Sequence, residues 1–130
     1  MSVPADVIEL VLPFKAEYVS IARLTASGIA NRVGFDIETI EDIKVAIAEV
    51  CNKLVKVGGE SGISYNIRFE VSENELTVVF NCGDASLKCI FDEENDELGI
   101  SIITALMDRV EFCPHGSYLL SMSKSVEGNM

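Results

Sequence analysis

The sequence contains no tryptophan, a single histidine and no two cysteines spaced as C-x-x-C. One histidine and no G-x-S-x-G motif leave no plausible Ser/His or Cys/His catalytic pair. The four cysteines lie in or beside apolar runs, where a reduced thiol behaves as a small hydrophobic side chain. The spacing of Cys82, Cys89 and His115 matches no known set of metal ligands. We therefore expect buried free thiols and no metal site.

Positive charge is also scarce. Ten Lys and Arg residues stand against 21 Asp and Glu residues, which gives a formal net charge of -11. Nucleic acids and anionic membranes bind basic surfaces, so neither is expected as a partner, and a protein with a basic surface fits better. The longest apolar stretches fall short of the roughly 20 residues that a membrane span needs, and no secretory signal pattern opens the chain. These features predict a cytoplasmic protein.

The first half of the chain changes its hydrophobic period once. Residues 7–13 alternate like a strand that ends at Pro13. From Lys15 the apolar residues recur every three or four positions, which predicts a helix that ends near Gly34. A second helix, capped by Asp36 or Thr39, should run to the glycines at 58 and 59. Its apolar seam is the clearest pattern in the sequence: Ile40, Ile43, Ile47, Val50, Leu54 and Val57.

The second half of the chain reads mainly as hairpins. Strands over 64–72 and 76–81 should pair, followed by a possible short strand at 86–91. A third helix is predicted from Leu98 to Asp108, and a last hairpin joins 109–113 to 117–125 around a turn at 114–116. This order predicts an α+β fold in one domain spanning 1–130: a two-layer sandwich of one mixed or antiparallel sheet with three helices on one face.

Two segments suggest ligand sites but lack the required patterns. The glycines of KVGGESGIS follow a helix and lack the order of a phosphate-binding loop, so they are expected to end the helix. The acidic run DEENDE at 92–97 lacks the glycine and the distal glutamate of a calcium loop. We expect a solvated loop there, with a partner-binding acidic patch as the alternative.

Glu49 and Lys53 lie four residues apart at the margin of the second helix. A Glu that precedes a Lys by four residues is the favoured orientation for a helical surface pair, worth about 0.2 to 0.5 kcal/mol. The same margin can also line a cleft. Periodicity alone therefore leaves Glu49 either as half of an ion pair or as a positioned carboxylate.

Longer stretches of the sequence resemble a known family. The segments YVSIARLTASGIANRVG, DIETIEDIKVAIAEVC and ALMDRVEF are similar in order and spacing to the serine-kinase anti-sigma factors of the RsbW/SpoIIAB type, within the GHKL ATPase superfamily. The resemblance runs from about Val7 to Ser123. It implies the α/β sandwich above, ATP and magnesium as cofactors, phosphorylation of a serine on an anti-anti-sigma antagonist, sequestration of a sigma factor, and a homodimer.

The resemblance assigns a role to the second helix. The family carries E-x-x-x-N there, with the Glu as general base and the Asn helping to hold magnesium. Here Glu49 occupies the first position and Lys53 the second. Asn52 is adjacent, but one residue along a helix is a rotation of about 100 degrees, so it should point elsewhere.

Two further boxes of the family are altered as well. The D-x-G that contacts adenine corresponds to Asn81 and Gly83, so a neutral amide replaces the carboxylate. The later G-x-G corresponds to Glu97 and Gly99, so a charged side chain replaces the glycine that lets backbone approach phosphate. The implied cofactor-binding positions are therefore Lys53, Asn81, Gly83, Glu97 and Gly99.

Glu97 and the acidic run place negative charge and bulk where a triphosphate would bind. Lys53 is the exception, because its ammonium could pair with phosphate directly, but magnesium would still lose a ligand. The sequence therefore predicts an anti-sigma-factor-like regulator that acts by binding proteins in a partner-switching system, with weakened or lost ATP binding and with Glu49 paired to Lys53. An active ATP-dependent serine protein kinase is the first alternative. A small-ligand module on the same sandwich is the second.

Overall fold

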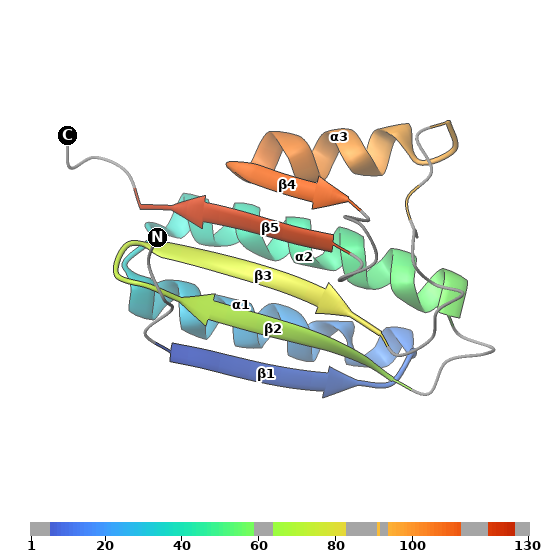
Figure 1. Cartoon of the computed structure of the whole chain (residues 1–130), viewed down its shortest axis with the longest axis horizontal. Coiled ribbons are helices and arrows are strands. Elements are labelled where there is room, and N and C mark those ends of the chain that lie inside the picture. The colour runs from blue at the N-terminus through green and yellow to red at the C-terminus, as the bar shows by residue number, and fades with distance from the viewer. Residues whose placement is uncertain (1–5, 59–63, 83–90, 92–93, 113–119, 127–130) are drawn as a thin grey trace.

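A computed structural model of the chain describes residues 6–58, 64–82, 91, 94–112 and 120–126 (Figure 1). The elements follow in the expected order. The possible strand at 86–91, except for Phe91, and the turn at 114–116 lie outside the described residues. The elements are β1 (Asp6–Leu12), the short 3-10 helix η1 (Ala16–Tyr18), α1 (Val19–Val33), α2 (Ile37–Gly58), β2 (Tyr65–Val71), β3 (Glu75–Asn81), α3 (Glu97–Leu106), β4 (Arg109–Phe112) and β5 (Leu120–Ser125).

The five strands form one sheet in the order β1-β2-β3-β5-β4, and all four pairings are antiparallel. The sheet is thus antiparallel, one of the two forms that the sequence allowed. One row of apolar side chains crosses every strand at the same level, because the register aligns Leu10, Ile67, Phe80, Leu120 and Phe112. Side chains alternate between faces along a strand, so this row lies on a single face.

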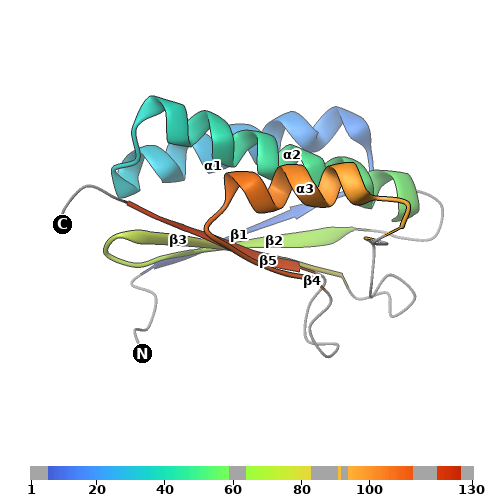
Figure 2. The same ribbon diagram turned by 90° about the horizontal axis from the view of Figure 1, so that it is seen from above.

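All three helices cover that same face of the sheet (Figure 2). The buried core fills the space between the two layers. The predicted two-layer α+β sandwich is therefore confirmed. Among the described residues, no helix combines the length and the apolar character that crossing a membrane requires.

The predicted seam of α2 faces the sheet except at its last member, because Val57 is 38% exposed at the end of the helix. Ile43, Ile47, Val50 and Leu54 are fully buried, as expected from their spacing. Of the two candidate caps, Asp36 is the one used, since its Oδ1 accepts a hydrogen bond of 2.8 Å from the backbone N–H of Thr39. Hydrogen bonds from the side chain and the backbone of Thr39 hold the pKa of the Asp36 carboxyl below its ordinary value.

The helix ends also follow from local chemistry. Gly34 ends α1 with a left-handed φ of 109°, which glycine adopts without a steric penalty. The third helix runs from Glu97 to Leu106, two residues short of the predicted end at Asp108. Met107 is already extended, with φ of -111° and ψ of 156°, because the chain must turn into β4.

A buried polar group lies near the end of α2. Tyr65 is almost completely buried, and its hydroxyl has no hydrogen-bond partner among the described residues. Burial is the main reason that the pKa of Tyr65 is raised, and the neighbouring Cys51 thiol adds to it without reaching hydrogen-bonding geometry. Burial likewise raises the pKa of the Cys51 thiol to about 12. Cys51 is therefore a protonated core residue, as the sequence predicted.

We expect Tyr65→Phe to raise the free energy of unfolding by about 1 kcal/mol, because it removes a buried hydroxyl that has lost its water without gaining a partner. Urea unfolding at pH 7 measures this. Tyr18→Phe is the matched control, since Tyr18 is only partly buried, and it should change stability by less than about 0.5 kcal/mol. A loss of stability in Tyr65→Phe would show that the hydroxyl is satisfied.

Candidate functional site

The candidate site lies where one flank of α2 meets the start of α3. Glu49 and Lys53 are both partly buried on that flank, one helical turn apart. The fully buried seam of α2 presses its other side against the sheet, so the margin residues are directed toward the neighbouring helix. Figure 2 shows α3 beside α2 on the same face of the sheet.

Lys53 is bound to α3 by an ion pair. Its Nζ lies 2.8 Å from Oδ1 of Asp96, the residue that precedes α3. The side chains are only 19% and 16% exposed, so the pair is shielded from most of the solvent. Asp96 occupies the N-cap position but makes no side-chain cap hydrogen bond. Its carboxylate instead joins two segments that are 43 residues apart in the sequence.

The predicted pairing of Glu49 with Lys53 is wrong. Among the described residues, the ion pair of Lys53 is with Asp96, and no ion pair joins Lys53 to Glu49. The physical reason is that a short charge-assisted hydrogen bond in a shielded position is stronger than an ordinary helical ion pair one turn apart. Periodicity could not reveal the competitor, because Asp96 reaches Lys53 only after α3 docks.

Glu49 lies against the first turn of α3. Its Oε1 is 3.5 Å from the point where a Cβ on Gly99 would lie, and the buried ring of Phe91 is equally close to that point. Phe91 in turn packs edge-on against Phe112, with ring centroids 5.5 Å apart. Backbone N–H groups at a helix start favour negative charge, so this location suits a carboxylate. The structure therefore brings Glu49, Lys53 and Gly99 together.

Asn81 is not part of this cluster. It ends β3, opposite Asn66 on β2 and next in the alternation to the buried Phe80, so its side chain starts on the face away from the helices. Its Oδ1 accepts a hydrogen bond of 2.8 Å from the backbone N–H of Cys82. No hydrogen bond joins Asn81 to α2 or α3 in the described part of the chain. Gly83 lies outside the described residues.

The acidic run divides between surface and site. Glu97 is exposed in the first turn of α3, where an acidic side chain interacts favourably with the helix dipole. Glu94 is also exposed, whereas Asp96 is drawn inward by Lys53. Sequence reasoning treated the run as a solvated loop or patch and missed Asp96. The available signal was its place before an apolar helix, which marks an N-cap but does not name a partner.

The fold, with its site between α2 and α3, is that of a known class of protein domain. Residues 12–124 match the family of histidine kinase-like ATPase domains. The similar proteins include the serine-protein kinase RsbW of Halalkalibacterium halodurans, which is 32% identical over 94% of this chain and 85% of that protein. RsbW of Bacillus subtilis is 32% identical, over 95% of this chain and 88% of its own length. RsbW of Oceanobacillus iheyensis is 35% identical over 93% of this chain and 87% of its own length. The chain belongs to the histidine kinase-like ATPase family, in its RsbW branch.

The Lys53–Asp96 pair should couple the two helices energetically. In a double-mutant cycle with Lys53→Met and Asp96→Asn, we expect a coupling energy of about 1 to 2 kcal/mol from urea unfolding, because the bond is short and shielded. The control cycle uses Lys44 and Glu41, whose ion pair is 3.1 Å long with a Glu side chain 60% exposed. Its coupling should stay below about 0.5 kcal/mol. Equal coupling energies in the two cycles would show that the Lys53–Asp96 pair stabilises the fold no more than a surface pair does.

Proposed function

We propose that this chain is an anti-sigma-factor-like regulator that acts by binding protein partners in a partner-switching system, and that its ATP binding is weakened or lost. The partners are a sigma factor and an anti-anti-sigma antagonist, and the protein works in the cytoplasm. Membership of the RsbW branch supports the regulatory role. The ion pair between Lys53 and Asp96 is the observation that supports the loss of ATP use.

Lys53 stands at a position where the family holds magnesium. In the family resemblance, an Asn at the position of Lys53 helps to hold the metal. A protonated ammonium has no free lone pair and cannot coordinate a cation. Lys53 moreover lies 2.8 Å from Asp96, so the carboxylate nearest to it is already engaged. The residues present therefore do not fit magnesium at this position.

The charge of the site also affects binding of the nucleotide itself. Asp96 pairs with Lys53, and Glu49 lies one turn before Lys53 against the first turn of α3, so two partly buried carboxylates accompany one ammonium. Magnesium-bound ATP still carries net negative charge. Partly buried charges are poorly screened by salt, so the carboxylates of Glu49 and Asp96 disfavour the triphosphate, and the exposed Glu97 adds a more strongly screened negative charge. The charge balance and the missing metal ligand act in the same direction.

One observation favours the alternative, an ATP-dependent serine protein kinase that phosphorylates the antagonist. Glu49, at the position of the family's general base, lies against the first turn of α3 and is not consumed by an ion pair with Lys53. A retained carboxylate could still accept a proton from a serine hydroxyl. Positioning of the triphosphate is the part that the substitutions remove, so we place this function second.

Nucleotide titration separates the two functions. By calorimetry, we expect the pure chain to show no binding of magnesium-ATP up to about 1 mM, the upper end of ordinary substrate affinities. The double variant Lys53→Asn, Glu97→Gly should gain at least about tenfold in affinity, because it restores a metal ligand and removes a charge near the phosphates. Lys56→Asn, Glu94→Gly makes the same chemical changes at exposed positions and should gain nothing.

Micromolar binding by the unmodified chain would favour the kinase. Capture of a sigma factor by the pure chain without nucleotide would support the proposed regulator, and capture only in the presence of ATP would contradict it. A third outcome is that the double variant Lys53→Asn, Glu97→Gly gains no affinity while the unmodified chain still captures a sigma factor. That result would support the regulatory role and would contradict the claim that Lys53 and Glu97 weaken ATP binding.

We also propose that the protein forms a homodimer through β1. This strand is a seven-residue edge without lysine or an internal proline, and its Val7 and Val11 are 54% and 59% exposed. The edge at the other end of the described sheet, β4, has four residues and presents Arg109 and Glu111. β1 also carries the charged residues Asp6 and Glu9, so its greater length and its exposed valines are what favour pairing there.

A lysine on β1 should disrupt this dimer. Val11→Lys is expected to raise the dimer dissociation constant at least about tenfold, since it places a charge in an apolar contact. Sedimentation equilibrium measures the constant. Leu24→Lys is the matched control, because Leu24 is 70% exposed on α1, away from the edge. A dimer that tolerates Val11→Lys as well as Leu24→Lys would exclude β1 as the contact.

A further inference from the structure

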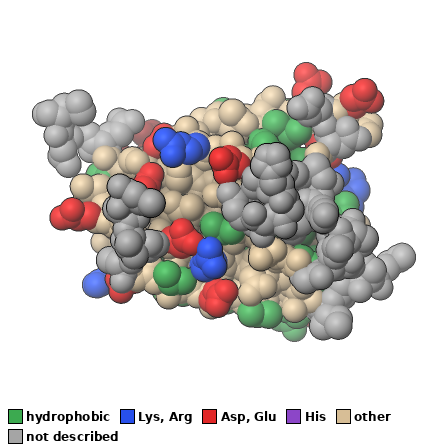
Figure 3. Space-filling model, in the orientation of Figure 1, with side chains coloured by type: hydrophobic (Ala, Val, Ile, Leu, Met, Phe, Trp, Pro, Cys, Tyr) green, Lys and Arg blue, Asp and Glu red, His purple; other side chains and the backbone are tan. Residues whose placement is uncertain are grey.

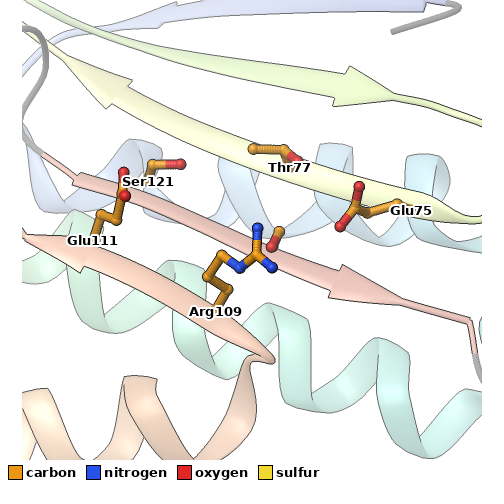
Figure 4. A pocket seen from close by; sticks show the side chains of 6 residues that line it. Glu75, Thr77, Arg109, Glu111 and Ser121 are labelled. Atoms are coloured by element: carbon orange, nitrogen blue, oxygen red, sulfur yellow. The ribbon is translucent and has the colours of Figure 1, made fainter. Parts of the chain in front are cut away.

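The sheet has a second face, which the helices do not cover (Figures 1 and 2). In Figure 3 this face shows scattered basic and acidic side chains with hydrophobic side chains between them, over a surface of other side chains and backbone. Strands β3, β5 and β4 enclose a hollow of about 190 Å³ on it (Figure 4). The lining residues are Glu75, Thr77, Arg109, Glu111, Ser121 and Ser123.

The hollow follows from side-chain length and register. Arg109, Ser123 and Thr77 lie in one row across the three strands, and Glu111 and Ser121 lie opposite each other in the next row. Hydroxyl side chains are short, so they form the floor, while the longer charged side chains form the rim. Ser123 is only 7% exposed although no helix covers it, and its hydroxyl makes no hydrogen bond to another described residue.

The charges of the rim are held apart. Figure 4 shows the guanidinium of Arg109 extending over β5, with the carboxylate of Glu75 turned toward it from β3. No ion pair within 4.0 Å joins them or engages either with another described residue. On the same face, Arg68 and Glu70 do pair, with Nε and Oε2 2.8 Å apart. The contrast leaves Arg109 and Glu75 with free hydrogen-bonding capacity on opposite sides of a polar floor.

We propose that this hollow binds a small zwitterion of the amino-acid type. The guanidinium of Arg109 can bind a carboxylate through two parallel N–H donors, and the hydroxyls of Ser123 and Thr77 can donate to the same group. The carboxylate of Glu75 accepts from the ammonium of the ligand. A simple anion would meet the carboxylates of the rim, and a simple cation would meet Arg109. Only a ligand that carries both charges satisfies both sides.

The size and place of the hollow limit the ligand further. A volume of about 190 Å³ is large enough for a free amino acid. The hollow lies on the opposite face of the sheet from Glu49, Lys53 and α3. The proposal is therefore independent of the ATP question, and its failure would leave the proposed function untouched.

The experiment is a titration of the ¹⁵N-labelled full chain, followed by NMR, with glycine, L-alanine, L-serine, L-glutamate and L-lysine. Acetate and methylammonium serve as probes of single charge. At least one amino acid should shift the backbone amides of Thr77, Ser121 and Ser123 and bind at least about tenfold more tightly than either single-charge probe. The amino acid that binds best reports the side chain that the hollow accepts.

Variants connect the binding to the named residues. Arg109→Gln and Glu75→Gln should each weaken the best ligand at least about tenfold, because each removes one charge partner. Arg68→Gln is the matched control on the same face and should leave the affinity unchanged. The proposal is overturned if no amino acid shifts these amides at ligand concentrations up to about 10 mM. It is also overturned if acetate binds as tightly as the best amino acid, or if Arg68→Gln weakens binding as much as Arg109→Gln.

Discussion

The packing of α2 on the antiparallel sheet is the constraint from which the other features follow. Four apolar residues of its seam, one or two turns apart, are completely buried against the central strands. A helix anchored along one stripe cannot rotate, so its flanks acquire fixed directions. That constraint turns Glu49 and Lys53 toward α3 and leaves Lys53 within 2.8 Å of Asp96. The site is thus a by-product of hydrophobic burial that positions charged residues at the margin.

The chain combines the fold of its family with an ion pair between α2 and the start of α3. The chain retains the sandwich and the order of elements of histidine kinase-like ATPase domains. Lys53 supplies a positive charge from within the protein, between α2 and the start of α3. An ion pair of this kind needs no cofactor to form. It offers a physical route by which a nucleotide-dependent fold could keep α3 docked without nucleotide.

The two faces of the sheet differ in polarity and in what they contribute to the protein. The face under the helices is apolar and holds the structure together. The other face carries hydroxyl and charged side chains on the same strands, because alternation directs neighbouring residues to opposite sides. Residues on the open face are therefore free of the packing demands of the core.

Much of the fold could be predicted from the sequence, because local periodicity reports which side chains are buried. The seam of α2, the caps at Asp36 and Gly34, and the alternation in β2 and β3 were all visible in the order of residues. What periodicity lacks is information about contacts between distant segments. The spacing of Glu49 and Lys53 allowed an ion pair without establishing one, and only the docking of α3 decided that Lys53 binds Asp96. The hollow around Arg109 likewise required the register of three strands, since its residues come from positions 75 to 123. The sequence by itself determined the elements and their buried faces, and the tertiary structure alone decided which charges meet, because Coulomb and hydrogen-bond energies depend on distance in space and not on separation along the chain.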